Sequence, residues 1–185
     1  MFKKVLRYAY RLSLKLGSKI RKLKFRLLYS QISFDRKTTL DRGCRIVCVN
    51  GGSISIRNSH ISFNSVIHAS KDAEISIKDS FISHNCTIVA KSKIIIGSNC
   101  LIGELVTIRD QNHIFSDPAK LIQDQGFASR PIMIEENVWI GCKATILAGT
   151  RIGKNSVIGA HALVKGAVEE NSLYAGVPAI KKKSF

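Results

Sequence analysis

Aliphatic and aromatic side chains recur every five or six residues along most of the chain. This spacing fits neither the 3.6-residue period of an amphipathic helix nor the two-residue period of a simple strand. It fits a prism in which each short strand sends one side chain inward and then turns a corner, with three strands to a coil. Taken coil by coil, the predicted inward positions are Phe34, Leu40 and Ile46; Ile56, Ile61 and Ile67; Ile77, Ile82 and Ile88; Ile96, Ile102 and Ile108; Ile134, Ile140 and Ile146; and Ile152, Ile158 and Val164. The pattern predicts an all-β, parallel β-helix of about six coils over residues 32–168.

The corners and one wall of this prism have sequence signals of their own. Segments 96–99 and 152–155 read Ile-Gly-Ser-Asn and Ile-Gly-Lys-Asn, which puts Gly and Asn where a tight turn needs unusual backbone angles. Segment 134–137 keeps the Asn. Four further isoleucines lie two residues before an inward position, the spacing of one strand face, and so lengthen one wall: Ile54, Ile75, Ile94 and Ile132.

One coil is interrupted by a segment without inward aliphatic positions, from Arg109 to Pro131. Loops this long inside a compact repeat are usually functional or disordered. This one contains the sequence Arg-Asp-Gln-Asn-His at 109–113, which favours function. We therefore expect residues 109–131 to form an active-site loop extruded from the coil.

Residues 1–31, before the coils, have the pattern of a cationic amphipathic helix. Apolar side chains at Phe2, Val5, Leu6, Ala9, Leu12, Leu16, Ile20, Leu23 and Leu27 follow helical spacing, and basic side chains at Lys4, Arg7, Arg11, Lys15, Lys19, Lys22 and Arg26 follow it on another face. Three roles remain open: capping the end of the β-helix, lying on an anionic membrane surface, or binding nucleic acid. The first two can both hold, and nucleic acid is disfavoured because no reading motif or aromatic platform accompanies the basic face.

The charge distribution and the cysteines bear on the cellular location of the protein. The formal net charge is +16, and residues 1–30 hold ten Lys or Arg and no acid. No run approaches the roughly 20 apolar residues of a membrane span, and the start lacks the apolar core of a secretory signal. Five scattered cysteines argue against a disulfide framework. We therefore expect a cytoplasmic protein, with a peripheral membrane location open.

Three further motifs complete a resemblance to a known family. The loop with Asn112-His113, the run Asn-Val-Trp-Ile-Gly at 137–141 and the ending Ala-Gly-Val-Pro-Ala at 175–179, together with the repeats, resemble the hexapeptide-repeat acyltransferases over residues 34–180. The resemblance favours the branch that O-acetylates sugars and polysaccharides. It implies a left-handed winding, a homotrimer with active sites in the clefts between subunits, acetyl-CoA as acyl donor and no metal.

The resemblance also implies roles for particular residues. His113 matches the family's catalytic histidine, and an imidazole that is mostly neutral near pH 7 can accept the acceptor's hydroxyl proton. Candidate contacts to the acceptor are Ser83, Asn85, Glu104, Asp110, Asn112 and Trp139. Either Asp110 or Glu104 could orient His113. Candidate contacts to the CoA moiety are Gly141, Cys142, Ala160, Lys165, Gly166, Lys181 and Lys183.

Two alternatives to sugar O-acetylation stay open at this stage. One is N-acetylation of an amino sugar, and the other is a non-catalytic trimeric scaffold on a membrane surface. A zinc enzyme of the related carbonic anhydrase type is disfavoured, because no two of the five histidines lie five positions apart. The C-terminal residues 169–185 are expected to follow the coils as a tail.

Overall fold

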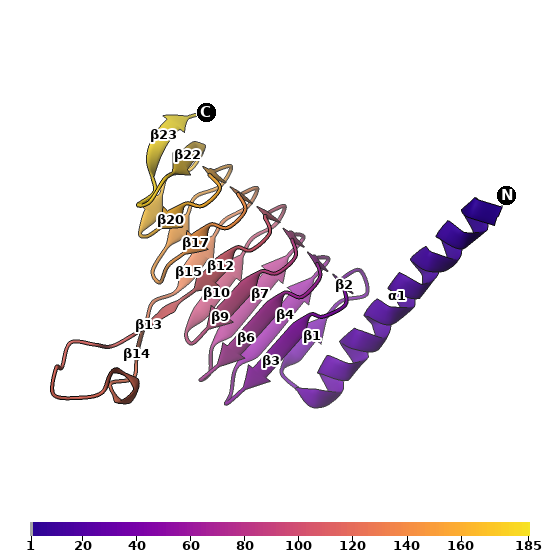
Figure 1. Ribbon diagram of the computed structural model, residues 1–185, viewed down its shortest axis with the longest axis horizontal. Coiled ribbons are helices and arrows are strands. Elements are labelled where there is room, and N and C mark those ends of the chain that lie inside the picture. Colours follow the sequence, from indigo (N-terminus) through magenta and orange to yellow (C-terminus); the bar gives the residue numbers. More distant parts are fainter. Residues whose placement is uncertain (1) are drawn as a thin grey trace.

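The computed structural model describes residues 2–185, without the side chains of Phe2 and Arg11, and it is a parallel β-helix capped by a helix (Figure 1). Sheet A stacks β1 (Ile32–Phe34), β4 (Ser53–Arg57), β7 (Glu74–Lys78), β10 (Lys93–Ile96), β15 (Ile132–Ile134), β18 (Arg151–Ile152) and β21 (Ala167–Val168). Sheet B stacks β2 (Thr39–Leu40), β5 (His60–Ile61), β8 (Phe81–Ile82), β11 (Leu101–Ile102), β16 (Trp139–Ile140), β19 (Val157–Ile158), β22 (Ser172–Ala175) and β23 (Ile180–Ser184). Sheet C stacks β3 (Arg45–Val49), β6 (Val66–Ser70), β9 (Thr87–Ala90), β12 (Thr107–Arg109), β17 (Thr145–Ile146) and β20 (Leu163–Val164).

The chain visits sheets A, B and C in turn, so each circuit is one coil and six circuits are complete. All eighteen predicted inward side chains are buried, none more than 4% exposed. The four additional isoleucines of the predicted wall lie inside sheet A and are equally buried. The strand register aligns them from coil to coil, as in Ile54 beside Ile75 and Ile94 beside Ile132. The predicted six-coil β-helix is therefore confirmed.

At the corner between sheets A and B, asparagines stack from coil to coil. Asn137, Asn155 and Asn171 all adopt positive φ, and each amide of the first two donates to the next at 2.9 Å. The corner glycines serve a different purpose from the one we expected. Gly97 and Gly153 have no positive φ, but an added Cβ would lie 2.8 and 2.6 Å from backbone atoms of the next coil. The Asn therefore supplies the unusual angle, and the Gly allows close stacking of the coils.

The last part of α1 (Phe2–Leu28) closes the open end of the first coil. Phe25 is only 7% exposed and joins the core. Ser18 accepts a hydrogen bond from the Leu40 amide at 2.9 Å, and Arg21 Nε donates to the Leu40 carbonyl at 2.9 Å. Lys22 Nζ donates to three carbonyls of the loop before β2. These bonds satisfy backbone groups at the sheet edges, so the capping role proposed for this helix is present in the structure.

At the opposite end of the β-helix, a strand reverses direction and pairs along the edge of sheet B. β21 and β22 begin a further partial coil, and β23 pairs antiparallel with β22 (Figure 1). Four of the five cysteines are buried in the coils, and no cysteine of the described chain forms a disulfide. Burial raises the pKa of the Cys86 thiol to about 11, so this side chain is a packing group rather than a nucleophile.

Candidate active site

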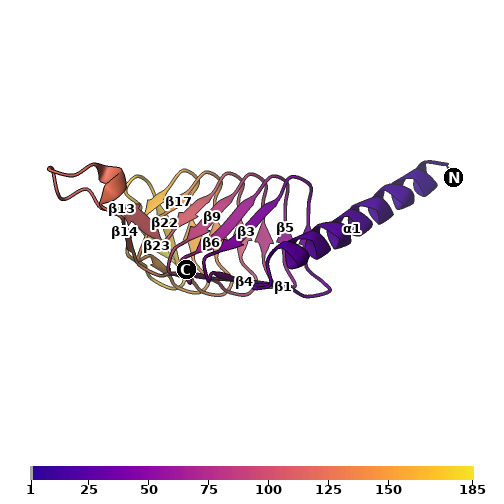
Figure 2. The same cartoon turned by 90° about the horizontal axis from the view of Figure 1, so that it is seen from below.

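The loop of residues 110–131 leaves the β-helix at the corner between sheets C and A (CA corner). Its base is a hairpin in which β13 (Gln111–His113) pairs antiparallel with β14 (Phe127–Ser129), and its far part holds a short 3₁₀ helix, η1 (Ile122–Asp124). The hairpin projects from the side of the coils, away from the helix end (Figure 2). The structure thus confirms the extruded loop as an ordered element.

His113 lies on this hairpin with its side chain exposed. Its ring packs against Phe127, its cross-strand partner, with ring centroids 4.2 Å apart. No side chain among residues 2–185 hydrogen-bonds the imidazole of His113, so both ring nitrogens remain available for a ligand or a neighbouring chain. Asn112, also exposed, faces Ala128 across the same hairpin.

Asp110, one of the two candidates to orient His113, is fully buried at the hairpin base. Its two carboxylate oxygens accept hydrogen bonds from the backbone amides of Lys91 and Ser92, at 2.8 and 2.7 Å. Its own carbonyl accepts the amide of Arg130 at 2.8 Å. Within one chain, Asp110 therefore fastens the loop to the preceding coil, and its carboxylate does not reach His113.

The other candidates for acceptor contact gather at the corner between sheets B and C (BC corner). Ser83, Asn85 and Glu104 lie there in successive coils. Asn85 has φ +57°, so it also forms the turn. Trp139 is 54% exposed and precedes the same corner on the outer face of sheet B, between Leu101 and Val157.

The BC and CA corners are separate within one chain. They are joined only by sheet C, whose strand β9 has four residues. At about 3.3 Å per residue, the two corners lie about 13 Å apart. One chain therefore does not bring His113 to Asn85, Glu104 or Trp139.

The candidate CoA contacts are likewise distributed over separate places: the BC corner, the CA corner and β23. Gly141, Cys142 and Ala160 stack at the BC corner, where an added Cβ on Gly141 would lie 2.6 Å from the Ala160 amide nitrogen. Gly141 is thus explained by close coil packing as well. Lys165 and Gly166 lie at the CA corner, after β20. Lys181 and Lys183 are on β23, where Lys181 forms an ion pair with Glu169 and the Lys183 amine lies 4.9 Å from the Phe185 ring centroid.

The structure adds a cationic group beside the hairpin that the sequence analysis missed. His68, Val89 and Arg109 occupy matching positions on the outer face of β6, β9 and β12. The Lys91 amine lies 3.9 Å from the ring centroid of Phe127, and so beside the ring that packs on His113. Burial, reinforced by the charges of Lys91 and Arg109, lowers the pKa of His68. His68, Lys91 and Arg109 are in three different coils, so their proximity could be recognised only from the register in which the coils stack.

The described residues contain neither a cluster of metal-ligand side chains nor a membrane-spanning helix. Among residues 2–185, no three His, Cys, Asp or Glu side chains converge in the manner of a metal site. No helix among the described residues is long and apolar enough to cross a membrane.

Comparison with known proteins finds one matching family model and several similar acetyltransferases. The model of the family "Bacterial transferase hexapeptide (six repeats)" matches residues 131–166. The galactoside O-acetyltransferase of Lactococcus lactis subsp. lactis is 36% identical over 105 residues, which are 57% of this chain and 50% of that protein. A putative lipopolysaccharide biosynthesis O-acetyltransferase of Escherichia coli (strain K12) is 38% identical over 104 residues, covering 51% of this chain and 53% of that protein.

A solved structure agrees with these relatives. The hexapeptide-repeat acetyltransferase VCA0836 of Vibrio cholerae O1 biovar eltor, complexed with acetyl coenzyme A, superposes with a TM-score of 0.62 at 28% identity, over 73% of this chain and 71% of that one. The chain spans about half the length, or less, of the first curated relatives it matches. The repeats and the coils of this chain are therefore similar to those of the hexapeptide-repeat transferases, whose family model matches residues 131–166.

Proposed function

We propose that this protein is an acetyl-CoA-dependent O-acetyltransferase that acetylates a sugar hydroxyl of a cell-surface polysaccharide or its precursor. The observation that carries the proposal is His113, exposed on an ordered hairpin that is fastened to the coils by Asp110. The similarity to galactoside and lipopolysaccharide O-acetyltransferases supports the acceptor class, and the acetyl-CoA complex of the Vibrio cholerae protein supports the donor.

The proposed reaction is a direct transfer. The acceptor hydroxyl oxygen attacks the thioester carbonyl carbon while the imidazole of His113 takes the hydroxyl proton. The tetrahedral intermediate then collapses, the carbon–sulfur bond breaks, and CoA leaves as a thiol with the proton that the His113 imidazolium returns to its sulfur. Ring stacking on Phe127 restricts the imidazole, which would hold it in position for this transfer.

The separation of the two corners supports a homotrimer as the working unit. A heterologous ring of three chains could bring the CA-corner hairpin of one chain to the BC corner of the next. Two exposed apolar surfaces have the character of such an interface. One is on the loop, at Phe115, Leu121 and Ile122, and the other is on sheet B, at Phe81, Leu101 and Trp139. We propose that the acceptor and CoA sites are completed between these surfaces.

An acetylation assay tests the proposal. The protein is incubated with acetyl-CoA and a panel of oligosaccharide and amino-sugar acceptors, and CoA release and ester formation are followed. We expect acceptor-dependent ester formation that falls at least about a hundredfold in His113→Ala, the usual scale for loss of a general base. The control is Ser129→Ala, at an exposed residue of the same hairpin that is not a candidate contact, and it should keep the fold and the activity of the wild type.

Three results would contradict the proposal. A fully active His113→Ala variant would remove this residue from the mechanism. Amide products on amino sugars, without esters on hydroxyl acceptors, would replace O-acetylation with N-acetylation. No transfer by a folded protein that binds no acetyl-CoA would favour a non-catalytic scaffold.

A further inference from the structure

The exposed face of α1 is the largest feature of the molecule that capping does not explain. The side chains that contact the β-helix, Ser18, Arg21, Lys22 and Phe25, follow i, i+3, i+4, i+7 spacing and so define one face. A second set, which we call the apolar stripe, consists of Val5, Ala9, Leu12, Leu16, Ile20, Leu23 and Leu27. At 100° per residue, the centre of the stripe lies about 170° from the capping face. The stripe therefore points away from the body of the protein.

Nothing in the described chain covers this stripe. Its large side chains are between 56% and 79% exposed, although leucines on a helix that packs on a core are ordinarily buried. The first half of α1 extends beyond the coils into open space (Figures 1 and 2). A continuous apolar face along a helix of 27 residues is a binding surface in need of a partner.

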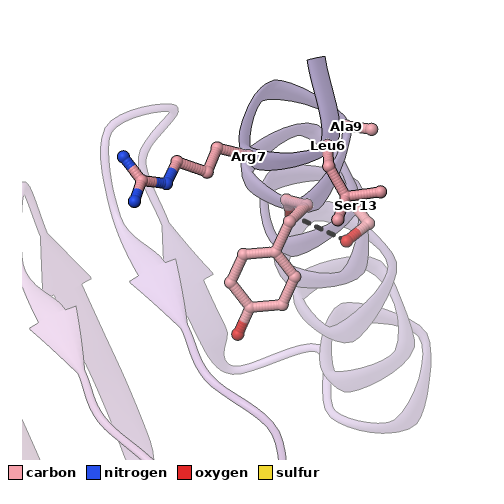
Figure 3. A pocket seen from close by; sticks show the side chains of 5 residues that line it. Leu6, Arg7, Ala9 and Ser13 are labelled. Atoms are coloured by element: carbon pink, nitrogen blue, oxygen red, sulfur yellow. Dashed lines mark hydrogen bonds between the residues drawn. The ribbon is translucent and has the colours of Figure 1, made fainter. Parts of the chain in front are cut away.

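The charges along α1 identify the chemistry of that partner. Six described basic residues take no part in the cap hydrogen bonds: Lys3, Lys4, Arg7, Lys15, Lys19 and Lys24. Residues 1–30 contain no Asp or Glu, and no ion pair reaches α1 from the rest of the described chain. Figure 3 shows the arrangement near the start of the helix, where Arg7 projects on one side and Leu6 and Ala9 lie on the other. An apolar face with a cationic flank and no acids is complementary to a surface that is apolar below and anionic above.

We propose that α1 docks in the plane of an anionic lipid bilayer, with the apolar stripe among the acyl chains and its basic flank at the headgroups. A second copy of the chain fits the same stripe less well, because it would bring two strongly cationic helices together without a counter-charge. The cap bonds anchor α1 to the first coil, so the helix would hold the whole protein at the bilayer. The hairpin with His113 projects elsewhere and stays free (Figure 2). The proposal does not depend on catalysis by the protein.

The test is flotation of the full chain with two kinds of vesicle at about 0.15 M salt: phosphatidylcholine alone, and phosphatidylcholine with about 30% phosphatidylglycerol. We expect the partition coefficient of the wild type to be at least about tenfold higher on the anionic vesicles. Leu12→Gln/Leu16→Gln should lower it about tenfold or more, since two leucines no longer leave water. Lys15→Gln/Lys19→Gln should weaken binding to the anionic vesicles specifically.

The matched control is Leu28→Gln, which replaces a leucine of similar exposure (59%) that lies more than a quarter turn from the centre of the stripe, and it should bind like the wild type. Unchanged binding by Leu12→Gln/Leu16→Gln would overturn the proposal, as would equal wild-type binding to both kinds of vesicle. A fall in sedimentation mass of the stripe variant, without loss of vesicle binding, would assign the stripe to contact between copies instead. Circular dichroism establishes that each variant is folded, and acetyl-CoA binding by the stripe variant separates this test from the proposed enzyme activity.

Discussion

At the scale of single residues, the site is built from groups with unequal roles. His113 is exposed and has no hydrogen-bond partner among residues 2–185, whereas Asp110, three positions before it, is buried and fully engaged by backbone amides. A carboxylate that accepts two amide hydrogen bonds is a strong structural anchor. Asp110 therefore positions the hairpin, and the imidazole of His113 remains free for the proton transfer that we propose.

His68 gives a pH-dependent signature of the cationic group beside the hairpin. Its pKa is lowered by burial and by Lys91 and Arg109, so the unfolded chain binds more protons than the folded chain below the ordinary histidine pKa of about 6.5. The free energy of unfolding should therefore fall as pH drops through this value. In His68→Gln this component should disappear, and the slope with pH should become shallower by well under 1.4 kcal/mol per pH unit, because the ring is partly solvated.

Urea denaturation between pH 5 and pH 8, within the range where histidines titrate, measures this slope. His84→Gln, at an exposed histidine of the BC corner, is the control for the substitution itself. A slope that is the same in His68→Gln and the wild type would contradict the assignment.

The sequence could nominate His113 as the candidate base, but it could not predict the contacts of the neighbouring residues. The histidine falls in a segment without inward aliphatics, which is visible in the spacing alone. The bonds from Asp110 to the amides at 91 and 92 connect residues almost twenty positions apart, and they depend on how one coil stacks on the previous one. The same stacking brings His68 and Lys91 toward Arg109. Predicting contacts between coils requires the exact register of the stacked strands, and the repeat period alone does not give that register.

At the scale of elements, each coil is stabilised by its inward aliphatic side chains. It also requires corner residues small enough to let the backbones of successive coils pack closely. The aliphatics were predictable because a period near six leaves few positions free, and all eighteen are buried. The corner glycines were recognisable, but their reason was not: Gly97, Gly103, Gly141 and Gly153 lie where a Cβ would touch the backbone of the next coil rather than where φ is positive. A close approach between the backbones of two coils cannot be predicted from the local sequence of either coil.

Gly141→Ala tests this account of the corners. The new methyl group would lie 2.6 Å from the Ala160 amide nitrogen, and the backbone of two coils would have to move apart. We expect a loss of about 1–3 kcal/mol in the free energy of unfolding, measured by denaturant titration. Gly17→Ala in α1 is the comparison, because its methyl group would meet only the flexible end of Arg21 and alanine favours a helix. Equal stability of Gly141→Ala and the wild type would show that the coils do not pack as tightly as described.

At the scale of the whole molecule, the proposed site needs more than one chain to be complete. The hairpin is at the CA corner and the candidate contacts are at the BC corner, so they lie at opposite ends of the strands of sheet C. No local sequence pattern reports this separation, because Glu104 and His113 are only nine positions apart along the chain. Which corner each residue occupies depends on where the chain turns from one sheet to the next.

Mixing two inactive variants tests completion of the site between chains. His113→Ala removes the base, and Ala160→Trp fills the proposed CoA path at the other corner; each should be inactive alone. After denaturation and refolding of an equal mixture, about a quarter of the sites should draw both intact halves from different chains, so about a quarter of the wild-type rate should return. Activity no higher than that of the separate variants would contradict a site shared between chains.

The central claim, that the protein uses acetyl-CoA, is tested most directly by calorimetric titration of the folded protein with acetyl-CoA, which requires no knowledge of the acceptor. We expect saturable binding of about one acetyl-CoA per chain, since the proposed ring of three chains has three equivalent clefts. Binding should be weakened in Ala160→Trp and retained in His113→Ala, which separates the donor site from the base. Absence of binding to a folded, trimeric protein would contradict the claim.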